Sequence, residues 1–264
     1  MSSLPTLKLS LLSIAIVGSW GVIASEKILD PLTSFDHKTW WKSDGWSNGF
    51  PFNNRWEATS IRNNTNGMQI VLFKEPAEYS NYAFSSGELR SHDFYSYGCF
   101  EVEMKPIAKP GVISSFFLFA GPFDTPDGGN GKHNEIDIEF LGNNTNILQL
   151  NFWTNDNSYI QSHEKLIYLN FDASTDFHRY GIKWTKKYIQ WFIDGEIVHQ
   201  VNNTQSDPIP SSQDSKLRVM ANVWPTDTAI ANWAGEFDTS TESELIARYK
   251  NIRIQEGKNC KITH

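Results

Sequence analysis

Strict alternation of apolar and polar side chains is the feature that most restricts what this chain of 264 residues can fold into. In GCFEVEMKP (98–106), Phe100, Val102 and Met104 fall on one side and the charged residues between them fall on the other. A period of two is typical of strands that bury one face. The pattern recurs along most of the chain after residue 50, without a linker or internal repeat. The sequence therefore predicts a single all-β domain, either a sandwich or a barrel.

Turn signals separate the alternating runs. Asp194-Gly195 joins KYIQWFID to EIVHQV, and Asn66-Gly67 stands between ATSIR and MQIVLF. Dipeptides of this kind between β-rich runs indicate hairpins. The only helix that we expect is a short one at Glu242–Tyr249.

The composition limits the class of ligand. The formal net charge is -7, so the chain repels phosphate backbones, and general nucleic-acid binding is excluded. There are ten tryptophans, more than a core of this size requires. The excess favours a ligand with a flat apolar face.

The first 24 residues are typical of a secretory signal peptide. Lys8 is the only charge before Glu26, and the apolar run over residues 9–24 ends in small residues up to Ala24. This run is shorter than the ~20 residues that span a bilayer, although an uncleaved anchor is the alternative. We therefore predict a mature domain of residues 25–264, secreted or periplasmic, with no membrane contact after cleavage.

The chain has two cysteines, Cys99 and Cys260, which are too few for a zinc cluster by themselves. They either pair with each other or remain separate thiols, and the sequence leaves both possibilities open. No cofactor is predicted.

Three acidic residues in HNEIDIEFLG are the candidate catalytic residues. Glu135, Asp137 and Glu139 have i, i+2, i+4 spacing and share one face of a strand, while the apolar residues between them share the other. A solvated acidic face is one interpretation of this spacing. The other is a coupled acid/base set in a cleft, and two carboxylates that flank a scissile bond are what glycoside hydrolysis requires.

Neighbouring runs favour the cleft. Amide, indole and charged side chains share the polar faces of ILQLNFWTN, KLRVMANVW and SGELRS. Amides bond hydroxyl groups and an indole stacks on a pyranose ring, so these faces have the chemistry of a sugar site. The residues are Gln149, Asn151 and Trp153, then Asn222 and Trp224, then Glu88 and Arg90.

The motif EIDIEFLG (135–142) resembles the active-site strand of glycoside hydrolase family 16, with the closer likeness to bacterial lichenases. Further matching segments run almost the length of the chain: DGWSNGFPFNNRW (44–56), SGELRS (86–91), YGCFEVEMKP (97–106), QLNFWTN (149–155) and FDASTDFHRYGIKW (171–184). Plant xyloglucan endotransglycosylases share the strand, and His133 before it is more similar to theirs.

The resemblance implies a concanavalin-like β-jelly-roll sandwich with an open cleft on its concave face. It also implies a retaining mechanism with Glu135 as nucleophile, Glu139 as general acid/base and Asp137 tuning their protonation. The sugar-contacting positions that it implies are Asn53, Glu88, Arg90, Gln149, Asn151, Trp153, Asn222, Trp224 and Trp233.

Several positions depart from the lichenase pattern. The lichenase disulfide cysteines fall on Asn54 and Ser86, and the Trp-Asp before the catalytic strand is replaced by His133-Asn134. Many lichenases bind a structural calcium through an aspartate on the last strand, where this chain has Lys250, so no metal is predicted. The lysine ammonium is expected to bond the backbone carbonyls in place of the ion. The loop PFDTPDGGNGK (122–132) is longer than its lichenase counterpart.

These features predict a secreted, monomeric endo-β-glucanase whose partner is a polysaccharide, most closely mixed-linkage β-1,3-1,4-glucan. One rival is a transglycosylase that passes the same glycosyl-enzyme to a sugar instead of water. A second rival is a non-catalytic glucan-binding lectin on the same sandwich, although a lectin has no need for three aligned carboxylates.

Overall fold

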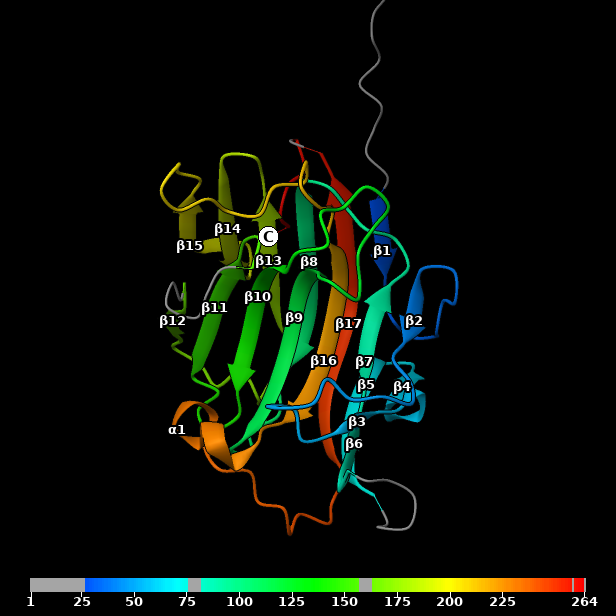
Figure 1. Cartoon of the computed structure of the whole chain (residues 1–264). Helices are drawn as coiled ribbons and strands as arrows, with labels where there is room; N and C mark the ends of the chain where they lie inside the picture. Colours follow the sequence, from blue (N-terminus) through cyan, green and yellow to red (C-terminus); the bar gives the residue numbers. More distant parts are fainter. Residues whose placement is uncertain (1–26, 76–81, 157–162, 258, 264) are drawn as a thin grey trace, which may run out of the picture.

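The computed structural model describes residues 27–75, 82–156, 163–257 and 259–263. The predicted signal peptide lies outside these residues. Two large, almost entirely antiparallel sheets pack face to face, as the predicted jelly-roll sandwich requires (Figure 1). Within the described residues, no helix is long and apolar enough to cross a membrane.

The first sheet has ten strands. Its main order is β15-β14-β13-β8-β17-β5-β6-β3, with β1 paired to β17 and β4 paired to β5. The strands are β1 (Lys27–Asp30), β3 (Arg55–Trp56), β4 (Ile61–Asn64), β5 (Gly67–Lys74), β6 (Phe84–Ser86), β8 (Gly98–Lys105), β13 (His178–Trp184), β14 (Tyr188–Ile193), β15 (Glu196–Asn202) and β17 (Leu245–Glu256).

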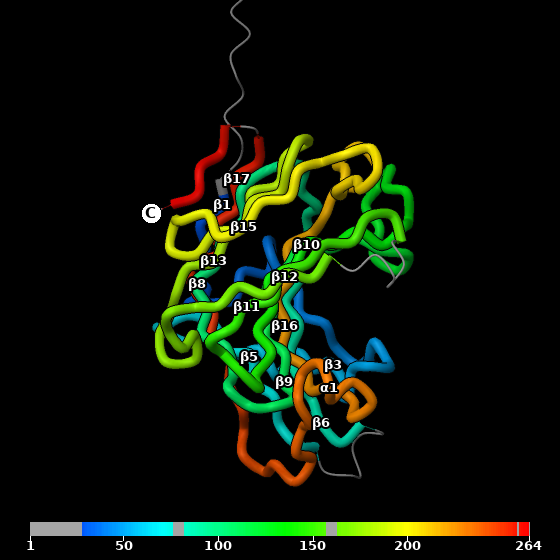
Figure 2. The backbone as a smooth tube through the Cα atoms, turned by 90° about the vertical axis from the view of Figure 1, so that its left-hand side faces the viewer, coloured from blue at the N-terminus to red at the C-terminus, as the bar shows by residue number. Residues whose placement is uncertain are grey.

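The second sheet has seven strands in the order β12-β11-β10-β9-β16-β7-β2. They are β2 (Trp40–Lys42), β7 (Glu88–Ser91), β9 (Val112–Ala120), β10 (Asn134–Leu141), β11 (Ile147–Trp153), β12 (Lys165–Tyr168) and β16 (Arg218–Pro225). Helical turns are few in the described part of the chain: η1 (Ala58–Ser60), η3 (Thr228–Ile230) and α1 (Ala231–Ala234). The turn α1 lies beside one end of β9 (Figure 2).

The core lies between the two sheets and confirms the alternation. Ile136, Ile138 and Phe140 of β10 are fully buried, as are Phe100 and Val102 of β8 in the opposite sheet. Full burial of a large apolar side chain contributes roughly 1.5–3 kcal/mol, so this layer holds the sheets together. The polar residues of β10 are thereby turned away from the core. We call that side of the seven-stranded sheet its outward face.

Both predicted hairpins are present. Asp194 and Gly195 join β14 to β15, and both have positive φ, +49° and +89°, as a tight two-residue hairpin turn favours. The β4–β5 hairpin turns one residue earlier than expected, at Thr65-Asn66, and Gly67 begins β5. A side chain at Gly67 would lie 2.5 Å from the carbonyl oxygen of Tyr249, so close packing against β17 also requires glycine there.

The helix predicted at Glu242–Tyr249 is wrong. Residues from Leu245 onward belong to β17, in which Ala247 and Tyr249 are buried with a period of two. Pairing with both β5 and β8 satisfies the backbone of this segment and outweighs its weak local helix signal.

The open question about the cysteines is settled in favour of a bridge. Cys99 on β8 and Cys260, which follows β17, form a disulfide with their Cα atoms 5.8 Å apart. The bond fastens the C-terminal segment to the ten-stranded sheet, the sheet that does not carry the three acidic residues.

Candidate active site

The three acidic residues of β10 lie on the outward face of the seven-stranded sheet. Asp137 is 5% exposed, and Glu135 and Glu139 are half-buried. This degree of burial excludes the solvated acidic face, which was the alternative interpretation of their spacing.

Burial and mutual repulsion set the proton affinities of these carboxyl groups. Burial, followed by the charge of Glu135, raises the pKa of Glu139 to about 8. Burial raises the pKa of Asp137 well above its usual value as well, and the charges of Glu135 and Glu139 and a hydrogen bond with Glu135 add to that shift. Near neutral pH Glu139 therefore holds its proton.

The neighbouring strand β11 places three predicted residues opposite the acids. Gln149 faces Glu139, Asn151 faces Asp137 and Trp153 faces Glu135. The side-chain amide of Gln149 donates to Glu139 Oε2 over 3.2 Å. The side-chain oxygen of Asn151 is buried and accepts no hydrogen bond from the residues that the structure describes, so an acceptor is available for a hydroxyl group beside Asp137.

On the other side of β9, β16 and β7 bring together Asn222, Glu88 and Arg90. Glu88 is 1% exposed and accepts hydrogen bonds from Asn222 Nδ2 (3.0 Å), Arg90 Nε (2.8 Å) and Ser43 Oγ (2.8 Å). These three bonds hold the carboxylate in place beside the face. It fixes the orientation of Asn222 and Arg90 at the face.

The remaining predicted residues gather near the end of the face that carries α1. The indole rings of Trp224 and Trp233 lie 6.1 Å apart, and Phe52 packs on Trp224 at 4.1 Å. The backbone N–H of Asn53 donates to Pro225 O, which brings Asn53 beside β16. Trp224 is buried whereas Trp233 is half-buried, so Trp233 offers the more accessible ring.

The structure adds residues that the sequence analysis did not select. Arg90 lies over the rings of Trp41 and Trp46, at 5.0 and 4.9 Å. Phe119 of β9 faces Glu135 across the sheet. The run GVISSFFLFA has no alternation that would place Phe119 on this face, and nothing in the sequence indicated the contacts of Arg90.

The long loop 122–132 is tied to the sheet by Asp124. Its two carboxylate oxygens bond Arg90 and Arg218, each over 2.7 Å. Burial raises the pKa of Asp124, against the lowering effect of these two arginines. The anchor fixes the loop beside the end of β9, and it leaves the adjacent Phe123 fully exposed.

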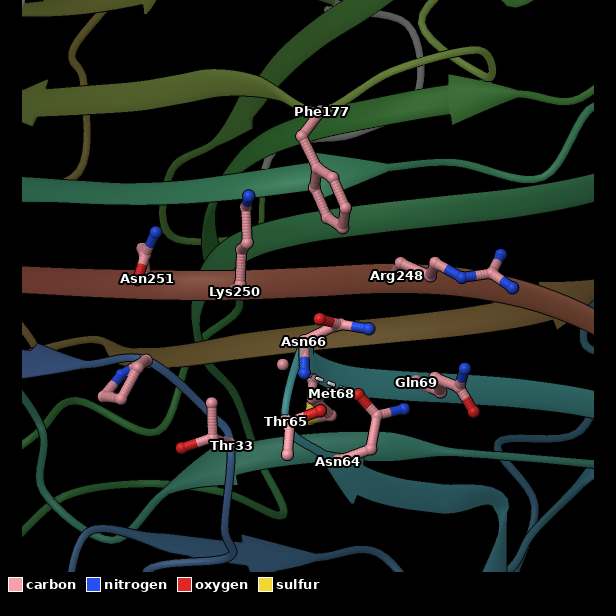
Figure 3. Close-up of a pocket in the computed structure, with 12 residues that line it drawn as sticks. Thr33, Asn64, Thr65, Asn66, Met68, Gln69, Phe177, Arg248, Lys250 and Asn251 are labelled. Carbon is pink, nitrogen blue, oxygen red and sulfur yellow. Dashed lines mark hydrogen bonds between the residues drawn. The ribbon is translucent and has the colours of Figure 1, made fainter.

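A pocket on the ten-stranded sheet lies where the resemblance places calcium, near Pro31 and Gly67 (Figure 3). Its lining offers amides, hydroxyls and the cations Arg248 and Lys250 but no carboxylate, so the donor set does not fit calcium. The expected role of Lys250 is wrong in detail. Its ammonium does not replace the ion among backbone carbonyls, because it pairs with Glu103 Oε2 at 3.4 Å and lies over the Phe177 ring at 4.2 Å.

The fold and the site define a glycoside hydrolase, because cleavage of a glycosidic bond needs one protonated and one ionised carboxyl group beside surfaces that hold sugar rings. The family model for glycosyl hydrolases family 16 matches residues 48–243, and the chain belongs to this family.

Individual relatives are similar over most of the chain. A β-glucanase of Paenibacillus polymyxa is 38% identical over 240 residues, which cover 91% of this chain and 92% of the relative. The crystal structure of a β-1,3-1,4-glucanase (lichenase) from a mouse hindgut metagenome superposes with a TM-score of 0.77 at 34% identity, covering 87% of this chain and 98% of the other. A β-glucanase of Bacillus licheniformis gives a TM-score of 0.76 at 33% identity, with 88% and 98% covered.

Proposed function

We propose that the protein is an exported, retaining endo-β-glucanase that hydrolyses mixed-linkage β-1,3-1,4-glucan. The observation that carries the proposal is the arrangement of three carboxyl groups on one face of β10, with the pKa of Glu139 raised to about 8. Glu139 therefore holds a proton at neutral pH, and Asp137, whose pKa is also raised well above its usual value, stands between it and Glu135. An acid beside a carboxylate nucleophile is the pair that the retaining mechanism uses.

In the first step, a carboxylate oxygen of Glu135 attacks the anomeric carbon while Glu139 gives its proton to the departing glycosidic oxygen. Asp137 donates a hydrogen bond to Glu135 and thereby orients the nucleophile. In the second step Glu139, now ionised, takes a proton from water, which attacks the anomeric carbon and releases Glu135. We propose that eight side chains bind the sugars around this point, and that Glu88 holds two of these side chains, Asn222 and Arg90, in position. The eight are Trp153, Asn151, Gln149, Asn222, Arg90, Trp224, Trp233 and Asn53.

The substrate class is inferred from the relatives. Proteins about a third identical over most of their length carry the names β-glucanase and β-1,3-1,4-glucanase.

A reducing-sugar assay on mixed-linkage glucan, laminarin, xyloglucan and agarose tests the proposal, with Glu135→Gln as the inactive control. We expect the highest rate on mixed-linkage glucan and short oligosaccharide products. Higher activity on laminarin or xyloglucan would reassign the substrate. Products longer than a defined donor would assign transfer rather than hydrolysis, and binding without turnover would assign a lectin.

A further inference from the structure

His133 precedes β10 and touches the proposed nucleophile directly. Its Nε2 lies 2.6 Å from Glu135 Oε2. The imidazole stacks on Trp153, with ring centroids 5.6 Å apart and an interplanar angle of 21°, and it leans against Phe119 at 5.5 Å. Trp153 and Phe119 are the residues that flank Glu135 in the register of β11 and β9, so the histidine completes an aromatic enclosure around one carboxylate.

The backbone of His133 is also held in place. Its N–H donates to Asp156 Oδ1 over 2.7 Å, and its carbonyl accepts from the N–H of Asp156 over 3.0 Å. Next to it, the Asn134 side-chain oxygen accepts from the N–H of Asn155 over 3.1 Å. The imidazole is thus aimed at Glu135 by contacts on both its ring and its backbone, as pre-organised groups in active sites are.

We propose that His133 is a positioning residue: it donates a hydrogen bond from Nε2 to Glu135 Oε2 and fixes the orientation in which this carboxylate attacks. The inference rests on the proposed function, in which Glu135 is the nucleophile. The proposal adds a cation, the imidazolium of His133, to a site whose other proposed catalytic groups are all carboxyl groups.

The charges around the imidazole support a protonated state. Burial by itself disfavours the imidazolium, but the hydrogen bond and charge of Glu135, together with the charge of Asp156, outweigh it and raise the pKa of His133. Asp137 lies behind Glu135 on the same face of β10, and Lys132, the preceding residue, is exposed. β9 and β11 present the uncharged rings of Phe119 and Trp153. An imidazolium at hydrogen-bond distance favours the ionised form of a carboxyl group.

The contact should be measurable in the rate. Below the raised pKa of His133 the imidazolium is present, and its Nε2 can only donate. We expect kcat of His133→Phe to fall about 10- to 100-fold with KM nearly unchanged, the range for loss of a hydrogen bond to a charged group.

The choice of variants separates packing from charge. Phenylalanine keeps the stack between Trp153 and Phe119 but lacks the donor. His133→Gln restores an N–H donor without a titrating charge, so we expect it to recover part of the lost kcat. His163→Phe is the matched control, because His163 also stacks on a ring (Phe152, 3.8 Å) and also bonds a carboxylate (Asp207, 2.9 Å) without touching Glu135. Its kcat and KM should equal those of the wild type.

The experiment measures kcat and KM for the wild type and these variants, beside the NMR titration of the His133 imidazole in wild type and Glu135→Gln. We expect the imidazole to titrate at lower pH in Glu135→Gln, since its anionic partner is gone; this readout stands even when His133→Phe fails to fold. An unchanged kcat in a folded His133→Phe, or an unchanged imidazole titration, overturns the role of His133. Full activity of Glu135→Gln instead overturns the proposed function itself.

Discussion

The side-chain amide of Gln149 donates to the carboxyl group of Glu139, and Trp233 fixes the direction of that donation. The indole N–H of Trp233 bonds Gln149 Oε1 over 2.9 Å, which leaves Gln149 Nε2 facing Glu139 Oε2 at 3.2 Å. An indole nitrogen is only a donor, so this contact selects one orientation of the amide. A residue at the α1 end of the face therefore helps to set the proton affinity of the proposed acid/base.

Protonation of Glu139 should govern the basic limb of the pH profile. Its pKa is raised to about 8, so the proton needed by the leaving group is present below this pH and is lost above it. We expect kcat/KM for the polysaccharide to fall as pH rises through about 8. Glu139→Ala should lower this rate about 10²- to 10⁴-fold, the usual contribution of acid/base catalysis.

An activated aryl glycoside is the control for that prediction, since its leaving group departs without a proton. We expect Glu139→Ala to form the glycosyl-enzyme from it at nearly the wild-type rate, measured as a burst of released phenol. Loss of the burst in a folded Glu139→Ala protein would contradict the role of Glu139.

Asp137 should tune the pH profile. Burial, and then the charges of Glu135 and Glu139, raise its pKa well above the usual value, and it hydrogen-bonds Glu135. In Asp137→Asn a donor remains but no proton titrates. We expect kcat/KM to fall at least about tenfold, corresponding to ~1.4 kcal/mol, with a shifted pH optimum. An identical profile would remove Asp137 from the tuning role.

The Cys99–Cys260 disulfide should stabilise the fold without affecting chemistry. It closes a separation of 161 residues and lies on the ten-stranded sheet, away from the outward face of the other sheet. A native disulfide typically contributes 2–4 kcal/mol. We expect the Cys99→Ser/Cys260→Ser variant to melt roughly 4–15 °C lower, at about 2–4 °C per kcal/mol, with unchanged kcat at 25 °C. Calorimetry measures the melting temperature and the activity assay measures kcat. Equal melting temperatures would contradict the stabilising role of the disulfide, and a lower kcat in the variant would contradict its separation from the chemistry.

Calcium should not stabilise this protein. The residues that line the pocket near Pro31 and Gly67 include no carboxylate, and the ammonium of Lys250 pairs with Glu103, which lies outside that lining. An ion that binds only the folded state must raise the melting temperature by mass action. We expect the same Tm in EDTA and in millimolar calcium, with Lys250→Asp as the variant that gains a calcium response. A rise of several degrees for the wild type, reversed by EDTA, would show that the metal site persists.

Most of the successful predictions rest on the alternation of apolar and polar residues along the chain. It placed Ile136, Ile138 and Phe140 in the core, and the acidic residues on the opposite face, because side-chain direction in a strand depends only on position. The helix at Glu242–Tyr249 failed because β5 and β8 provide pairing partners on both sides of that segment, which no local signal contains.

Contacts between segments that lie far apart in the chain could not be predicted from the sequence. Cys260 meets Cys99 only because β17 lies beside β8 with Gln255 opposite Cys99. The bonds from Asp124 to Arg90 and Arg218 join a loop without periodicity to two strands. The burial of Glu88 likewise depends on how closely Ser43, Arg90 and Asn222 surround it.

The identity of the nucleophile is the central claim, and peptide mapping after mechanism-based labelling tests it most directly. An activated 2-deoxy-2-fluoro oligosaccharide forms the glycosyl-enzyme rapidly and releases it slowly, because the fluorine destabilises the oxocarbenium-like transition state. We predict one added glycosyl group per chain, on Glu135 within the peptide that contains residues 134–141, and none in Glu135→Gln. A label on Glu139 or Asp137, or turnover with inverted anomeric configuration and no label, would contradict the account.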